Sequence, residues 1–300
     1  MPRHFFSIQE LSRDKAWGLV QRAHEMKTTN HRSTLLAGKT IVLIFEKAST
    51  RTRISFQVGI HHLGGNTLLM TPTESQLGRS EPLGDTARCL SRYVDGLVVR
   101  TFGQEKLDTL AQYGSIPVIN ALTNEGHPCQ VLSDMLTMYE RTPDLASLKV
   151  AWIGDGNNMA NSWIEAASRF GFALTLACPE GYDPCPATMD RARADGASIT
   201  LVRDPLLAAR GADYINTDVW ASMGQEEEQK IREAAFKDFL VSEELMALAA
   251  PGAKFMHCLP AHRGEEVTSA VIEGPASIVF DQAENRLHMQ KAIVEFVFTT

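Results

Sequence analysis

Hydroxyl and guanidinium side chains follow one another in a row shortly after a short apolar run. The run is IVLIF at residues 41–45, and the segment STRTR occupies residues 49–53. A strand that ends near Glu46 and a helix that starts near Thr52 leave the intervening backbone N–H groups open to a ligand. These donors, the positive end of the helix dipole and the Arg51 guanidinium favour an anion such as phosphate. The glycines and the GK[ST] ending of a P-loop are missing.

A second set of polar residues lies at or after the later strand-like runs of the first half of the chain. Arg100 ends one apolar run, and the segment HPCQ occupies residues 127–130. Pro128 stiffens the turn and suits the first position of a helix, so His127 and Gln130 project from that helix's first turn. An imidazole and an amide placed there can donate to a carbonyl oxygen that becomes negative during a reaction.

The second half contains an asparagine-rich turn in IGDGNNMANS, residues 153–162. The G-x-G at 154–156 invites a dinucleotide-binding interpretation, but Met159 stands where the third glycine of that fingerprint belongs. Asn157 and Asn158 are better suited to hydrogen bonds with a small polar ligand.

Two further stretches place reactive groups at strand ends. In DVWASMG, residues 218–224, the Asp218 carboxylate closes a strand pattern; in FMHCLPAHRGEEV, residues 255–267, Cys258 does so. A thiol there can be a nucleophile, a proton acceptor or a buried filler. A zinc site of His257, Cys258 and His262 is disfavoured, because no fourth ligand is evident and consecutive strand residues point to opposite faces.

Each stretch taken alone also has a plain structural explanation. Ser49 or Thr50 can simply cap a helix while the arginines face solvent. Arg100 can be a surface charge, His127 a structural histidine, and residues 226–228 (EEE) an ordinary acidic loop. The combination of all these stretches at strand ends is what favours a binding site, since ligands of open α/β sheets gather at the carboxyl ends of strands.

The elements that position these residues alternate along the chain. Short apolar runs that do not alternate with polar residues are typical of strands buried on both faces of a parallel sheet. Strands are expected at 39–46, 66–71, 95–101, 116–122, 149–155, 172–177, 198–203, 213–219, 254–259 and 277–281, with helices near 51–63, 85–93 and 104–113. Two successive series predict an α/β fold of two doubly wound domains with parallel central sheets, joined by interdomain helices.

The domain boundary is expected in ERTPDLASL, residues 140–148, where Pro143 and polar residues break the helical pattern. Residues 1–142 and 143–284 then form the two domains, and a terminal helix within 285–300 packs back onto the first.

Composition narrows the class of protein. The chain has 300 residues, 44% of them hydrophobic, and a formal net charge of −7, which disfavours general binding to nucleic acid or to anionic membranes. No secretory signal or membrane span is apparent. The five cysteines are odd in number without a CxxC pair, so reduced thiols in the cytoplasm are expected.

Together the motifs resemble those of the transcarbamoylases, the aspartate/ornithine carbamoyltransferase family. STRTR (49–53) and HPCQ (127–130) look like the carbamoyl-phosphate motifs of the whole family. DVWASMG (218–224) and HCLP (257–260) look like the motifs of its ornithine-specific members, and aspartate-specific members share only the first pair. The likeness runs essentially from end to end.

The resemblance implies roles for particular residues. Those that match carbamoyl-phosphate contacts are Ser49, Thr50, Arg51, Thr52, Gln76, Arg100, His127, Gln130, Cys258, Leu259 and Arg286, the last expected at the start of the terminal helix. Those that match ornithine contacts are Asn158, Asp218, Ser222 and Met223. The residues implied to be catalytic are Arg51, Arg100, His127 and Cys258, the cysteine as proton acceptor.

The implied reaction transfers the carbamoyl group of carbamoyl phosphate to the δ-amine of L-ornithine, giving citrulline and phosphate. Neither a metal nor an organic cofactor is implied, and the family is built on trimers. The same site serves arginine biosynthesis and the reverse, catabolic direction.

The sequence leaves three alternatives open. A sibling enzyme acting on acetylornithine, putrescine or aspartate is disfavoured by Asp218 and the SMG residues, which suit a free α-amino group. A nicotinamide-dependent dehydrogenase built on residues 149–171 lacks the third glycine. A retired enzyme that acts only as a binding or regulatory subunit would not need the full set of polar residues.

Overall fold

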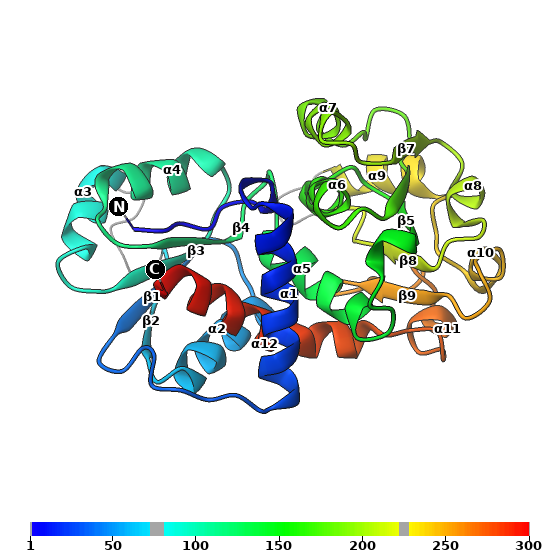
Figure 1. The fold of residues 1–300 in the computed structure, drawn as a ribbon. Helices are drawn as coiled ribbons and strands as arrows, with labels where there is room; N and C mark the ends of the chain where they lie inside the picture. The colour runs from blue at the N-terminus through cyan, green and yellow to red at the C-terminus, as the bar shows by residue number, and fades with distance from the viewer. Residues whose placement is uncertain (1, 73–80, 222–227, 300) are drawn as a thin grey trace. The chain divides into compact units, whose positions relative to one another are not determined.

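A computed structural model describes residues 2–72, 81–221 and 228–299 of the chain (Figure 1). The chain forms two compact units. The first contains the residues up to Leu136 together with those from Glu284 onward, and the second is Thr137–Ala283. Among the described residues, no helix is both long and apolar enough to cross a membrane.

The first unit is built on a four-stranded parallel sheet. Its strands are β1 (Thr40–Phe45), β2 (Asn66–Met70), β3 (Gly96–Arg100) and β4 (Val118–Leu122), in the order β2-β1-β3-β4. The three strands β1, β3 and β4 are almost wholly buried, as their unbroken apolar runs require, whereas the edge strand β2 is partly exposed.

Helices link these strands and cover the sheet. The helices that belong wholly to this unit are α1 (Arg13–Thr28), α2 (Arg51–His62), α3 (Leu83–Leu90) and α4 (Gln104–Tyr113), after a 3₁₀ turn at Ile8–Glu10. Two more, α5 (Pro128–Tyr139) and α12 (Val279–Phe298), contribute residues to both units. α12 approaches α2 closely, because a Cβ atom at Gly59 would lie 3.3 Å from Lys291 Cγ.

The expected strand at 277–281 is wrong. Ser277 makes only an isolated bridge to Phe255, and helical hydrogen bonding starts at once, with Gln282 N donating to Ile278 O over 2.9 Å. The terminal helix therefore begins at Val279, and Arg286 lies about two turns inside it rather than at its start.

The second unit is built on a five-stranded parallel sheet. Its strands are β5 (Lys149–Ile153), β6 (Ala173–Ala177), β7 (Ile199–Val202), β8 (Tyr214–Thr217) and β9 (Lys254–His257), in the order β7-β6-β5-β8-β9. Its helices are α6 (Asn158–Phe170), α7 (Pro186–Ala194), α8 (Pro205–Ala209), α9 (Gln229–Phe236), α10 (Glu243–Met246) and α11 (Ser269–Ile272), with a 3₁₀ turn at Leu145–Ser147.

Each sheet has one topological switch point, which is where ligands of doubly wound folds bind. In the first sheet the chain goes from β1 to β2 on one side and then returns to β3 on the other. In the second it goes from β5 to β6 and β7, then returns to β8 beside β5. The carboxyl ends of β1 and β3, and of β5 and β8, are therefore the expected binding edges. The α/β fold of two parallel-sheet domains is confirmed.

Candidate active site

The segment after β1 lies at the switch point of the first sheet. α2 begins at Arg51, and its N-cap residue Thr50 makes no side-chain cap hydrogen bond. Ser49 is half-buried, and Thr50 is exposed. The hydroxyl of Thr50 is therefore not used to cap the helix, which removes the plain structural explanation for that residue and favours an anion at the helix start.

α12 brings Arg286 to the first turn of α2. The Arg286 guanidinium donates to the Thr52 hydroxyl, and the two residues are only 3% and 1% exposed. This bond fixes a buried positive charge at the start of α2, where it can contribute to binding an anion.

The His127 imidazole lies among three guanidinium groups. It is 4% exposed at the end of the loop that leads into α5. Burial and the positive charges of Arg286, Arg100 and Arg51 hold the pKa of His127 well below its ordinary value. The imidazole is therefore neutral at physiological pH and offers one N–H donor. We call Arg51, Arg100, His127 and Arg286 the basic cluster.

Gln130 lies on the first turn of α5, shortly after His127 of the basic cluster. Its amide nitrogen donates to Asp134 Oδ1 over 2.9 Å, while its Oε1 atom is buried with no hydrogen-bond partner among the described residues. Sequence analysis expected this amide to act as a donor, and the structure shows one of its two N–H groups bonded to Asp134 within the helix. The buried Oε1 atom is an acceptor, which suits the N–H bonds of a carbamoyl group.

Lys47 is a neighbour of the basic cluster that sequence reasoning missed. Burial, and then the charge of Arg100, lower its pKa. Its ammonium donates to Asn124 Oδ1 over 2.6 Å and lies 4.5 Å from the Phe102 ring centroid. The EKASTRTR sequence contained the signal, since Lys47 lies two residues before the stretch that was expected to bind an anion.

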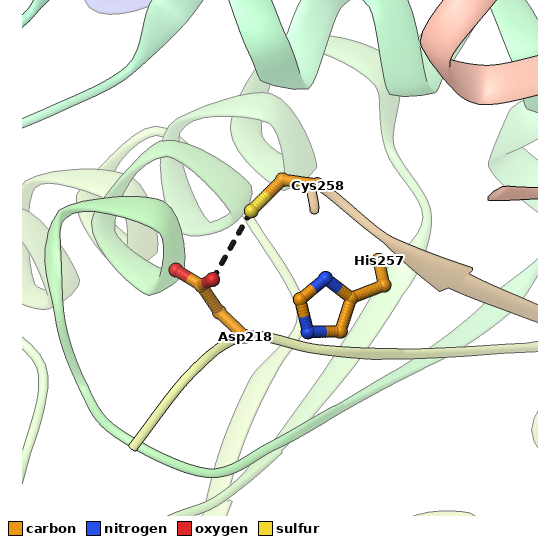
Figure 2. Close-up of side chains that lie close together, drawn as sticks. All are labelled: Asp218, His257 and Cys258. Carbon is orange, nitrogen blue, oxygen red and sulfur yellow. Dashed lines mark hydrogen bonds between the residues drawn. The ribbon is translucent and has the colours of Figure 1, made fainter. Parts of the chain in front are cut away.

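Asp218 is the centre of a polar group at the switch point of the second sheet. It follows β8 directly, and its Oδ1 atom accepts from Val219 N at 2.9 Å and from the Cys258 thiol at 3.1 Å (Figure 2). Asn157 Nδ2 donates to its Oδ2 atom at 3.0 Å. The carboxylate is thereby fixed by three elements that meet at the carboxyl edge of the sheet.

The Asn157 side chain serves a helix and the site at once. Its Oδ1 atom accepts from Met159 N and Ala160 N and so caps α6, while its amide nitrogen faces Asp218. Asn158, the residue implied to contact ornithine, begins the helix and is half-buried.

A hydrogen-bonded histidine supports the HCLP segment after β9. His257 Nδ1 accepts from Leu259 N at 2.8 Å, so the ring proton resides on Nε2, which donates to Glu266 Oε1 at 3.1 Å. Leu259 has a φ of +60°, an unusual conformation for a non-glycine residue. The bond from its N–H group to His257 helps to hold that conformation.

The geometric argument against a zinc site was wrong in one respect. The ligand atoms of Asp218, His257 and Cys258 all lie within 4.8 Å of one another, because β9 ends at His257 and the pleat does not continue to Cys258 (Figure 2). Both nitrogens of His257 are nevertheless engaged with Leu259 and Glu266. An ion bound there would have to break one of those bonds.

Two charged residues near Asp218 had no clear signal in the sequence. Asp155 and Arg232 form a buried ion pair with 2.7 Å between Oδ2 and Nη2, although they lie far apart in the chain. Three other expected site residues, Gln76, Ser222 and Met223, lie outside the described residues.

The fold and these clusters define the class of protein. Two doubly wound α/β units, one with a basic cluster and one with a fixed carboxylate at the switch point, are typical of an enzyme that binds small polar substrates. Two family models agree with this division: "Aspartate/ornithine carbamoyltransferase, carbamoyl-P binding domain" matches residues 3–140, and "Aspartate/ornithine carbamoyltransferase, Asp/Orn binding domain" matches residues 146–297.

Individual relatives are similar over their full lengths. A protein named ornithine carbamoyltransferase from Nitratidesulfovibrio vulgaris (strain DP4) is 68% identical over 299 residues, covering 100% of both chains. The solved structure of ornithine carbamoyltransferase from Pyrococcus furiosus has a TM-score of 0.93 at 44% identity, covering 98% of this chain and 96% of that one. The structure from Thermus thermophilus has a TM-score of 0.92 at 39% identity, covering 100% of both chains. The chain belongs to the aspartate/ornithine carbamoyltransferase family.

Proposed function

We propose that this protein is an ornithine carbamoyltransferase, which transfers the carbamoyl group of carbamoyl phosphate to the δ-amine of L-ornithine. The products are L-citrulline and phosphate. The observation that carries the proposal is the basic cluster, in which a neutral buried histidine lies among three arginines at the switch point of the first sheet. That arrangement suits a dianionic phosphate with a carbonyl group attached.

Residues 1–142 with 285–300 are proposed to bind carbamoyl phosphate, and residues 143–284 to bind ornithine. Arg51, Arg286 and the N–H groups at the start of α2 bind the phosphate. Arg100 and His127 donate to the carbamoyl oxygen, and the Gln130 carbonyl accepts from the carbamoyl amino group. The proposed carbamoyl-phosphate residues are Ser49, Thr50, Arg51, Thr52, Gln76, Arg100, His127, Gln130, Cys258, Leu259 and Arg286.

Asp218 is proposed as the counter-ion of the ornithine α-ammonium. Its fixed orientation, set by Val219, Asn157 and Cys258, supports that role. The proposed ornithine residues are Asn158, Asp218, Ser222 and Met223.

The proposed chemistry is an addition followed by an elimination. The neutral δ-amine attacks the carbamoyl carbon, and the carbonyl oxygen becomes an oxyanion that Thr52, Arg100 and His127 stabilise. Each such donor is worth roughly 3–4 kcal/mol in comparable sites. The carbon–oxygen bond to phosphate then breaks, and phosphate leaves with the bonding electron pair toward Arg51. Cys258 takes the proton that the amine loses as a thiolate, and the thiol so formed donates to Asp218 Oδ1, the bond seen in the structure.

The proposal extends to assembly and location. A homotrimer in the cytoplasm, contributing to arginine biosynthesis, is proposed from the resemblance of the motifs. Light scattering after size exclusion should give three times the 33.1 kDa chain mass, or a multiple of that.

An acceptor panel tests the proposed function. The purified chain is incubated with carbamoyl phosphate and L-ornithine, N-acetyl-L-ornithine, putrescine or L-aspartate in turn, and released phosphate and the carbamoylated product are both quantified. Only ornithine should give product at a substantial rate. A preference for another acceptor, or no product with any of them, contradicts the proposal.

A further inference from the structure

Beside Asp218 lies a second carboxylate that has its own counter-ion. Arg232 of α9 donates from Nη2 to Asp155 Oδ2 over 2.7 Å, and the two residues are 4% and 7% exposed. Asp155 lies in the turn after β5, and Asp218 directly follows β8, the strand next to β5 in the sheet. Burying an ion pair this deeply costs desolvation free energy, and hydrophobic residues of similar volume often stabilise a fold as well or better. The pair therefore indicates a role other than stability.

Aromatic rings hold the arginine in place. The Arg232 guanidinium carbon lies 4.9 Å from the Tyr182 ring centroid and 5.7 Å from that of Phe236. These two rings contact each other edge-on, with 4.8 Å between their centroids. Cation–π contact and the short ion pair together leave the guanidinium little freedom, so its charge is fixed next to Asp155.

Asp155 and Asp218 interact electrostatically. Burial raises the pKa of Asp155 to about 6, Arg232 acts in the opposite direction, and the negative charge of Asp218 contributes to the increase. Cys178 after β6 is another titratable group that interacts with Asp155, and its own pKa is raised by burial and by the Asp155 charge. Without Arg232, two carboxylates would therefore repel each other across this edge of the sheet.

We propose that Asp155 and Arg232 are a positioning pair whose charges cancel, so that the group they form with Asp218 presents one net negative charge to ornithine. The pair carries one negative and one positive charge, so together with Asp218 the group has a net charge of −1. That value matches the one positive charge of the ornithine α-ammonium. This inference rests on the proposed function and adds two residues that determine how strongly the substrate is held.

The single variants should have opposite electrostatic effects. Asp155→Asn leaves the Arg232 cation without its partner, and that cation then competes with the α-ammonium for Asp218. The KM for ornithine should rise roughly 10- to 100-fold, the range expected for one unit charge several ångströms away at an intermediate dielectric. Arg232→Gln removes the cation, so Asp155 is protonated more readily, and the pH dependence of the KM for ornithine that follows Asp155 ionisation extends to higher pH than in the parent.

The double variant Asp155→Asn/Arg232→Gln is the decisive comparison. It removes both charges, restores the net charge of −1 and has no carboxyl group left to titrate at this position. Its KM for ornithine should return to within about fivefold of the parent value, and the extra pH dependence of Arg232→Gln should be absent. Arg232→Lys, which keeps the charge, should also stay near the parent value at neutral pH.

A matched ion pair elsewhere in the second unit serves as the control. Arg169 Nη1 lies 2.9 Å from Asp195 Oδ2, away from the strand ends that carry the site. Arg169→Gln should leave the KM for ornithine unchanged. Thermal unfolding of every variant, with and without carbamoyl phosphate, separates loss of folding from loss of ornithine binding.

The outcomes are distinct. If the double variant is as impaired as Asp155→Asn, or if kcat falls while the KM for ornithine and its pH profile do not change, the pair has only a structural role and the inference is overturned. Should Asp155→Asn fail to fold, the comparison of Arg232→Gln with Arg232→Lys across pH still decides the question. Failure of the proposed function is separate, because it would appear in the parent protein as absence of citrulline.

Discussion

At the scale of single residues, the protonation state of His127 matters most. Burial and three neighbouring arginines depress its pKa, so the imidazole donates one hydrogen bond and does not act as an acid in the neutral range. The same depressed pKa makes the free energy of unfolding depend on pH. As the pH falls below about 6.5, the unfolded chain takes up a proton that the folded site refuses, so the free energy of unfolding should decrease.

His127→Gln tests the donor role of the imidazole. We expect kcat to fall roughly 100- to 1,000-fold, as for loss of one oxyanion donor. In the parent and in the variant alike, the rate should rise with pH, because the ornithine amine, whose pKa in water is about 10, must lose its proton before it attacks. Steady-state kinetics from pH 6 to 9 measures both quantities. Loss of an acidic limb in the variant would show that His127 titrates during the reaction.

Arg51→Ala tests the phosphate contact. Removing this guanidinium should lower kcat/KM for carbamoyl phosphate by at least about 100-fold, since charge-assisted bonds to the leaving group strengthen in the transition state. The control is Arg53→Ala, two residues further along α2, whose side chain is exposed. That variant should remain within a few-fold of the parent, and equal loss in both would remove the specific role of Arg51.

At the scale of elements, the helix starts differ in what their N-cap side chains do. Ser12 Oγ accepts from Lys15 N and caps α1, whereas Thr50 makes no such bond at the start of α2. A helix start whose cap side chain is unused keeps its N–H groups and positive dipole end available to an anion.

Thr50→Ala and Ser12→Ala should therefore have opposite consequences. Ser12→Ala should lose about 1 kcal/mol of stability and leave activity unchanged. Thr50→Ala should leave the melting temperature nearly unchanged and weaken carbamoyl-phosphate binding. Thermal unfolding and calorimetric titration of both variants give the comparison, and equal destabilisation by the two changes would contradict it.

The cap of α6 gives a second prediction at this scale. Asn157→Asp keeps an oxygen that can cap the helix but replaces the amide donor to Asp218 with a carboxylate. Stability should change little, whereas ornithine kcat/KM should fall roughly 10- to 100-fold through the disturbed carboxylate. Unaltered ornithine kinetics would show that the hydrogen bond from Asn157 to Asp218 does not contribute to ornithine binding or turnover.

Elements were more predictable from sequence than contacts were. The strands at 39–46 and 149–155 were expected correctly because unbroken apolar runs are typical of buried parallel strands. The strand expected at 277–281 does not form, because α12 begins at Val279. The short apolar run IVF at 278–280 fits the start of a helix as well as a strand. The Asp155–Arg232 pair joins residues 77 positions apart, and no local pattern indicates which partner a buried charge will find.

At the scale of the whole molecule, the two polar clusters belong to different units. The basic cluster and the Thr52–Arg286 bond lie in the first unit, whereas Asp218, Asn157 and Cys258 lie in the second. A change at Asp218 should therefore leave the carbamoyl-phosphate contacts of the first unit intact.

Asp218→Asn makes that division measurable. The substitution keeps the shape of the side chain and removes the charge that would face the α-ammonium. Breaking a buried charge pair costs about 3–5 kcal/mol, so ornithine kcat/KM should fall by roughly two to four decades. Carbamoyl-phosphate affinity, measured by calorimetry on the free enzyme, should hardly change. A collapse of carbamoyl-phosphate binding in this variant would place Asp218 in a different role.

The position of the new bond tests the central claim most directly. Carbamoyl phosphate labelled with ¹³C is incubated with the purified chain and ornithine labelled with ¹⁵N at the δ position, and the product is examined by NMR. The carbamoyl carbon should show one-bond coupling to the δ nitrogen, and ornithine labelled at the α position should give no such coupling. A carbon bonded to the α nitrogen, or a ¹³C signal that remains in carbamoyl phosphate and its hydrolysis products, would contradict carbamoyl transfer to the δ-amine.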